Sequence, residues 1–209
     1  MNELVANLGY LLLVINMVLF FIGFSKSGRA YRIFAVYLAI MFVIQMVANI
    51  MSYMSFNNLF VSHFYFILQF IVLSLFYLEL LNTNTQRKTV RLFLVICPLV
   101  LMLQYFNDAD IFFKFNLFEI FITSFLLIIY STFYLYNMLN TKRLFYYVNI
   151  GILIYLFGST VLFLTGNIMT KLNSSLNDHT WVLNSALYIV YQLFILYEWS
   201  VSRLGIKEN

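Results

Sequence analysis

The chain has 209 residues, of which 63% are hydrophobic, 20% aromatic and only 10% charged. A soluble domain carries about 25% charged residues, so this chain has too few charges to cover a water-facing surface. The composition excludes a soluble globular protein and indicates an integral membrane protein. The partner that this class implies is the lipid bilayer in which the protein is embedded. The net charge of +4 comes from residues that flank apolar segments, which is typical of membrane topology and not of nucleic-acid binding.

Seven apolar segments are long enough to cross a bilayer, because a hydrocarbon core of about 30 Å requires roughly 20 helical residues. In chain order they cover about residues 4–24, 33–54, 60–81, 90–107, 116–139, 147–168 and 181–201. The fourth is short and contains Pro98, which removes a backbone hydrogen bond and is expected to kink its helix. We predict an all-α fold, a polytopic bundle of seven transmembrane helices that forms one domain over residues 1–209.

The charges of the loops alternate along the chain. Basic residues follow the first, third and fifth segments and occupy the C-terminal tail: Lys26, Arg29, Arg32, Arg87, Lys88, Arg91, Lys142, Arg143, Arg203 and Lys207. The remaining loops hold Lys114 and Lys171 together with Asp108, Asp110 and Asp178. Because excess Lys and Arg marks the cytoplasmic side, we predict that the N-terminus lies outside and the C-terminus in the cytoplasm. The start of the chain has no basic region or cleavage pattern, so the first segment is predicted to be a retained span.

Polar residues in several spans recur on one helix face. At about 100° per residue, Asn184, Tyr188 and Tyr191 share a face of the last span. Polar side chains in a membrane usually face the bundle interior or a wet cavity, although Asn and Gln also join helices as hydrogen-bonding glue. We expect the polar face of the last span to meet that of the fifth span. The predicted outward-facing ligand pocket is then lined by Gln45, Asn49, Gln69, Glu119, Thr123, Asn184 and Tyr188.

Motifs for catalysis, metal ions and cofactors are missing from the sequence. It contains no HExxH, CxxC, GxSxG, Walker or dinucleotide-binding pattern, and Cys97 is the single cysteine. His63 and His179 are isolated at predicted outer span edges, where a lone histidine usually forms an interfacial hydrogen bond. We therefore predict no catalytic residue, metal or cofactor and a protein that is not an enzyme. A lipid enzyme would need acids such as Glu79, Glu119 and Glu198, which fall on both membrane faces.

Two glycines of the sixth span lie on one helix face. Gly151 and Gly158 are seven residues apart, and small residues allow helices to approach closely. The spacing permits two arrangements. This face packs against a neighbouring helix of the same chain, or it contacts a membrane protein partner, including a second copy in a homodimer.

The C-terminal part of the chain resembles a known group. The stretches "YYVNIGILIYLFGSTVLFLTGNIM" and "WVLNSALYIVYQLFILYEW" contain an Ile-Tyr-x-x-Gly pattern at Ile154–Gly158 and a Trp-x-x-Asn pattern at Trp181–Asn184. Over about the last 60 residues the chain is similar to small bacterial seven-helix membrane proteins and sensory domains associated with histidine kinases. The resemblance implies a receptor-like role in signal transduction, exerted through a partner, and a location in a bacterial cytoplasmic (inner) membrane.

The sequence leaves several functions open. A non-enzymatic receptor or sensor would bind a small or amphiphilic ligand in the outer pocket and act through a partner. A small-solute transporter would need a midplane site, discontinuous helices and internal repeats. A structural subunit of a membrane complex would use the glycine face for packing. Because a fold by itself does not define function, the geometry of the site has to decide among them.

Overall fold

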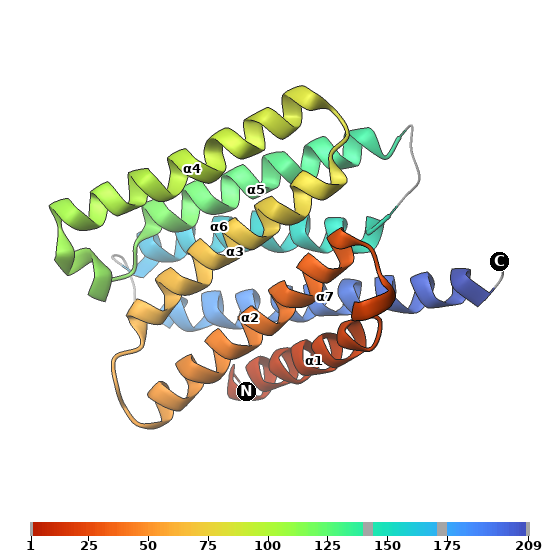
Figure 1. The fold of residues 1–209 in the computed structure, drawn as a ribbon. Coiled ribbons are helices and arrows are strands. Elements are labelled where there is room, and N and C mark those ends of the chain that lie inside the picture. The colour runs from red at the N-terminus through yellow and green to blue at the C-terminus, as the bar shows by residue number, and fades with distance from the viewer. Residues whose placement is uncertain (1, 140–143, 171–174, 208–209) are drawn as a thin grey trace.

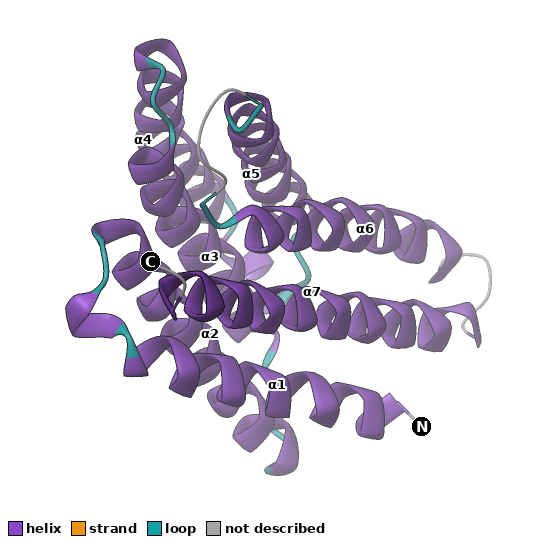
Figure 2. Ribbon diagram, turned by 90° about the vertical axis from the view of Figure 1, so that its right-hand side faces the viewer, coloured by secondary structure: helices purple, strands orange, loops and turns teal. Residues whose placement is uncertain are grey.

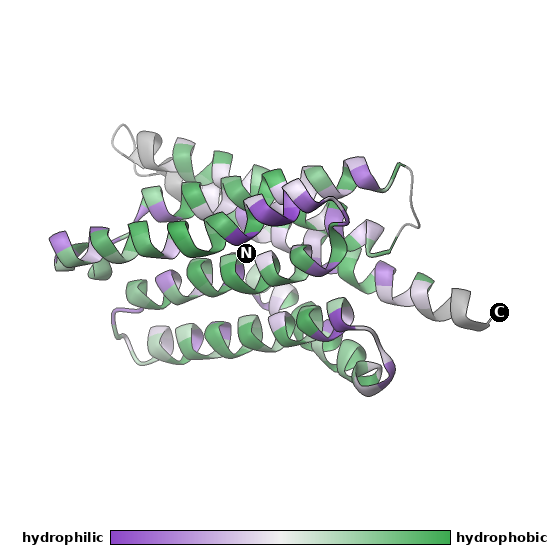
Figure 3. Cartoon of the chain, turned by 45° about the horizontal axis from the view of Figure 1, so that its top comes forward, coloured by the Kyte–Doolittle hydropathy of each residue, from purple (hydrophilic) through white to green (hydrophobic). Residues whose placement is uncertain are grey.

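The computed structural model describes residues 2–139, 144–170 and 175–207 (Figure 1). Over these residues it contains seven helices that are long and apolar enough to cross a membrane, as predicted. Residues of hydrophobic character predominate along them (Figure 3). They are α1 (Asn2–Ile22), α2 (Arg29–Tyr53), α3 (Leu59–Leu80), α4 (Asn84–Asn107), α5 (Leu117–Asn137), α6 (Tyr146–Thr170) and α7 (Ser175–Lys207). Two short 3-10 turns, η1 (Phe24–Lys26) and η2 (Ala109–Phe113), precede α2 and α5.

The helix boundaries differ from the predicted spans mainly in α4 and α7. α4 begins at Asn84 instead of residue 90 and continues through Pro98. α7 covers Ser175–Lys207 instead of residues 181–201. The predicted spans were defined by apolar composition, whereas backbone hydrogen bonding continues into polar residues at the ends of a helix. The polar N-terminal turns of both helices therefore lie outside the predicted spans.

Six of the helices form a closed ring. α1, α2, α3, α5, α6 and α7 each pack against the next in this order, and α7 returns to α1. α4 lies outside this ring, where it contacts only α3, α5 and η2 among the described elements (Figures 1 and 2). The order of the helices around the ring therefore differs from their order in the chain, because α3 packs directly against α5 and α4 is not part of the ring.

Aromatic and polar side chains fill the interior of the ring. In its predicted inner half, Asn149 of α6 is fully buried and joins three helices. Its Oδ1 accepts hydrogen bonds from Tyr77 Oη of α3 at 2.8 Å and from Ser131 Oγ of α5 at 3.0 Å. Its Nδ2 donates to the Ser131 carbonyl at 3.2 Å. This network fixes the rotation of three helices about their axes.

The glycines of α6 pack against α7 within the chain. A Cβ atom added at Gly151 would lie 2.8 Å from Phe194 Cβ, and one added at Gly158 would lie 2.7 Å from Leu187 Cδ1. Real Cβ atoms do not approach other atoms so closely. Gly151 therefore requires glycine, because Phe194 Cβ is fixed close to the α7 backbone, whereas at Gly158 the end of the flexible Leu187 side chain would have to shift. Of the two arrangements that the sequence permits, this is the one within the chain. Gly151 is buried beneath α7, whereas Gly158 is partly exposed and also lines an open apolar groove between α6 and α7.

Two acids at the predicted inner end have different partners. Glu79 pairs with Arg29, with a distance of 3.4 Å between Oε1 and Nε. Glu198 is 6% exposed and accepts a hydrogen bond from the Tyr147 backbone N–H at 2.8 Å. Because the first N–H groups of a helix have no partner within it, Glu198 caps α6 and ties it to α7.

The orientation of the bundle is testable with reporters of membrane side. The two termini lie toward opposite ends of the bundle (Figure 1), as an odd number of spans requires. From the loop charges, we expect a reporter inserted at Arg87 to lie in the cytoplasm and one inserted at Asp110 to lie outside. A C-terminal reporter serves as a third point and should be cytoplasmic. A C-terminal reporter on the outside would contradict the predicted orientation.

Candidate functional site

An open cavity of about 230 Å³ lies at the predicted outer end of the ring. Aromatic rings form much of its wall, and the described residues that line it include no charged side chain. Its lining residues come from α2, α3, α6, α7 and the segments that precede α3 and α5. They are Ile44, Gln45, Ala48, Asn58, Leu59, Val61, Ser62, Tyr65, Phe66, Phe115, Tyr155, Phe163, Trp181 and Asn184.

Tyrosine hydroxyls bound the cavity on its inner side. Tyr65 Oη of α3 and Tyr155 Oη of α6 lie 3.2 Å apart, and both residues line the cavity. Beneath them, Gln69 Nε2 lies 3.5 Å from Tyr65 Oη and donates to Tyr37 Oη of α2 at 3.1 Å. Tyr191 Oη of α7 donates to the same Tyr37 oxygen at 3.4 Å. Four ring helices therefore meet in one hydrogen-bond network below the cavity.

Two buried polar atoms beside this network, Tyr188 Oη and Asn184 Oδ1 of α7, form no hydrogen bond of ordinary geometry with a described residue. The side chain of Gln192 lies near Tyr188 Oη, one turn further along the same helix. Tyr188 is 8% exposed and its ring packs against that of Tyr155, with 5.7 Å between centroids. A buried polar atom without a hydrogen bond is costly and calls for an explanation, and water or a ligand in the neighbouring cavity would supply the missing bonds.

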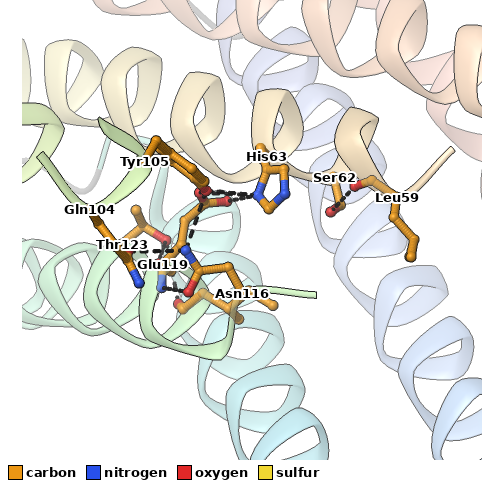
Figure 4. Close-up of polar contacts among 9 residues, drawn as sticks. Leu59, Ser62, His63, Gln104, Tyr105, Asn116, Glu119 and Thr123 are labelled. Carbon is orange, nitrogen blue, oxygen red and sulfur yellow. Dashed lines mark hydrogen bonds and ion pairs between the residues drawn. The ribbon is translucent and has the colours of Figure 1, made fainter. Parts of the chain in front are cut away.

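A second polar cluster, the His63 cluster, lies on the opposite side of α3 (Figure 4). It consists of His63, Gln104, Tyr105, Asn116, Glu119 and Thr123. His63 Nδ1 lies 3.2 Å from each oxygen of the Glu119 carboxylate, and Tyr105 Oη lies 2.9 Å from the same nitrogen. Tyr105 also donates a hydrogen bond to Glu119 Oε2. His63 is 2% exposed and Glu119 0%, so the pair at the centre of the cluster is buried, whereas Gln104 and Tyr105 at its edge are partly exposed.

Local sequence positions Glu119 in this cluster. Asn116 precedes α5, and its Oδ1 accepts a hydrogen bond from the Glu119 backbone N–H at 3.3 Å. An Asn at this position caps a helix, and a carboxylate in the first turn interacts favourably with the helix dipole. Asn116 Nδ2 in turn donates to Gln104 Oε1 of α4 at 3.1 Å. The cap therefore fixes both the start of α5 and the position of its acid.

The structure separates the residues of the predicted pocket into groups. Gln45 and Asn184 line the cavity, and Gln69 and Tyr188 lie directly beneath it. Asn49 is exposed on the outside of α2, because the face of α2 that lines the cavity is centred on Ile44 and Ala48.

Glu119 and Thr123 belong to the His63 cluster. The expectation that the polar face of the seventh span meets that of the fifth is wrong, since α5 and α7 make no contact among the described residues. Side by side with α5 in the ring lie α3 and α6. The polar face of α7 itself is as predicted, with Tyr188, Tyr191, Ile195 and Glu198 buried.

Sequence reasoning missed most of the His63 cluster. His63, Tyr105 and Asn116 come from three separate segments, and each alone has an ordinary interfacial role. The spacing of Asn116 and Glu119, which matches a helix cap with an acid three residues later, is the one local signal. The side chain of His179 lies outside the described residues, as do Lys142 and Arg143.

Comparison with models of protein families, with curated proteins and with solved structures finds no match to this chain.

Proposed function

We propose that this protein is a membrane receptor that binds a small, uncharged, amphiphilic molecule in the outer cavity and acts through a partner. The observation that carries the proposal is the cavity itself, which combines an aromatic wall with a few convergent amide and hydroxyl groups. Such a combination is typical of ligand sites, where apolar contacts give affinity and a few polar groups give orientation. The absence of charged side chains among its described lining residues favours a ligand without a net charge.

The size of the cavity limits the ligand. At about 230 Å³ it exceeds the cavity of about 150 Å³ that accepts benzene in another protein, so a molecule somewhat larger than one aromatic ring fits. The aromatic side chains of Tyr155, Phe163 and Trp181 suit a flat apolar body. The amides of Gln45 and Asn184 suit one or two hydrogen-bonding groups on the ligand.

The tyrosine network gives such a ligand a route to the rest of the bundle. Tyr65 and Tyr155 line the cavity and are linked through Gln69 and Tyr37 to α2 and α7. A ligand that took a hydrogen bond from Tyr65 would change the partners available to this network. The described part of every span is an uninterrupted helix, which favours binding without transport, because transporters typically bind at broken helices.

Filling the cavity should prevent ligand binding without unfolding the protein. We expect native mass spectrometry to detect a small molecule that co-purifies with the wild type. Ala48→Phe adds an aromatic ring at the cavity wall, so this variant is expected to co-purify without that molecule. The matched control is Val43→Phe, on the same helix but 58% exposed, which should keep it. Equal small-molecule content in both variants would contradict the proposal.

A further inference from the structure

The His63 cluster contains a buried nitrogen that the cavity and its network do not use. His63 Nε2 is buried and forms no hydrogen bond of ordinary geometry with any described residue. The backbone of Phe112 and of Lys114 nevertheless lies within reach of the ring, and the Phe112 ring stacks on it with 5.4 Å between centroids. The free atom therefore points to the segment of chain around η2.

The hydrogen-bond pattern assigns the state of the ring. Nδ1 lies against the Glu119 carboxylate, an acceptor, so it carries a proton in both charge states of the ring, and in the neutral ring Nε2 keeps its lone pair. This tautomer is inferred from the partners, as is usual for histidine. Tyr105 donates its own proton to the same carboxylate. With the imidazole neutral, the Glu119 carboxylate is the one charge of the cluster, and its two oxygens are held by His63 Nδ1 and Tyr105 Oη.

We propose that His63 Nε2 is a proton-binding site and that proton uptake there clamps the η2 segment and closes the outer cavity. Nε2 accepts a proton from water and the imidazole becomes an imidazolium, which compensates the charge of Glu119. An uncompensated charge in an apolar site is costly. The imidazolium–carboxylate pair has no net charge, so its population increases as the pH falls. The new N–H then donates to a carbonyl of Phe112 or Lys114 and holds η2 against α3.

Other ionisable groups around His63 do not replace it in this role. α4 contributes Tyr105 and Cys97, the second of which interacts electrostatically with Glu119. α5 contributes Glu119 itself. On the η2 side, Asp110 and Lys114 are exposed to the surroundings. Histidine is the residue whose ordinary titration falls between about pH 5 and about pH 8, which makes His63 the responsive member of the cluster.

The η2 segment connects this site to the cavity. Phe115, one residue beyond Lys114, lines the cavity and packs against Phe163 with 5.5 Å between ring centroids. Phe163 in turn packs against Trp181 at 5.9 Å. Fixing the backbone around Lys114 therefore fixes one wall of the cavity. The effect of this closure on ligand entry rests on the proposed function, whereas the proton site itself can be measured without any ligand.

Trp181 is a natural reporter of the closure. The chain has two tryptophans, so Trp199→Phe leaves Trp181 as the sole emitter at the cavity. In this background without ligand, we expect acrylamide quenching of Trp181 to decrease by at least about twofold from about pH 8 to about pH 5, the range in which imidazole titrates. Acrylamide is uncharged, so protein charge does not change its access.

Substitution of the two histidines identifies the responsible group. His63→Gln is expected to remove the pH response, whereas His179→Gln, which changes the only other histidine, should preserve it. If His63→Gln does not fold, Glu119→Gln replaces it. Loss of the opposite charge should then move the midpoint by more than about one pH unit toward acid.

Quenching that does not depend on pH, or that keeps its midpoint when His63 or Glu119 is changed, would overturn the proton site. Failure of the proposed function has a different signature. In that case Ala48→Phe would leave co-purified molecules unchanged while the pH response of Trp181 persisted.

Discussion

Asn149→Leu is expected to lower the free energy of unfolding by about 2–4 kcal/mol, because each buried polar group left without a partner costs about 1–3 kcal/mol. Leucine has the same number and branching of side-chain heavy atoms as asparagine but can neither accept from Tyr77 Oη nor donate to the Ser131 carbonyl. The expected effect exceeds the average of about 0.6 kcal/mol for hydrogen bonds between membrane helices, since more than one group of this fully buried network loses its partner. Reversible unfolding in a denaturing detergent, followed by circular dichroism, measures the change.

The matched control for this substitution is Asn49→Leu. Asn49 is exposed on the outside of α2, where leucine removes a polar group from contact with lipid. We expect Asn49→Leu to leave the stability unchanged or to raise it slightly. A loss of stability similar to that of Asn149→Leu would show that Asn49 faces protein or a polar cavity, and would contradict the packing of α2 described above.

Gly151→Leu is expected to prevent the docking of α6 on α7. Even the first carbon of the new side chain would lie 2.8 Å from Phe194 Cβ and 3.0 Å from Tyr191 Cδ2. Overpacking of a tight core typically costs about 1–3 kcal/mol and sometimes more, and here backbone-proximal atoms on α7 leave little room for adjustment. We expect loss of the folded monomer, measured by size-exclusion chromatography and by protease resistance of the α6–α7 region.

Gly28→Leu is the control, since a Cβ atom at Gly28 would meet nothing within 4 Å. Its φ of −63° suits any residue, so the variant should fold as the wild type does. The opposite outcome at Gly151 is informative. A Gly151→Leu protein that stays folded and monomeric but loses crosslinked dimers would mean that this glycine faces a partner chain.

Membrane class and span number follow from the sequence because they depend on local composition. A helix that crosses hydrocarbon must satisfy its own backbone hydrogen bonds, so a run of about 20 apolar residues is sufficient to predict a span. Periodicity likewise identifies the buried face of α7, with Tyr188, Tyr191 and Glu198, since the geometry of a helix is fixed by its own backbone. Each of these inferences uses residues that are close together in the chain.

The neighbours of each polar face were decided only by the tertiary structure. Periodicity gives the direction of Glu119 from the axis of α5, but not which helix lies in that direction. That helix is set by side-chain packing between distant segments, which places α4 outside the ring and brings α3 against α5. As a result Glu119 meets His63 and Tyr105, while Asn184 lines a cavity on the other side of α3. The sequence identifies the polar residues individually. Their division into two sites depends on contacts between residues more than 40 positions apart, such as His63 and Glu119, which are 56 positions apart. No local sequence pattern predicts such contacts.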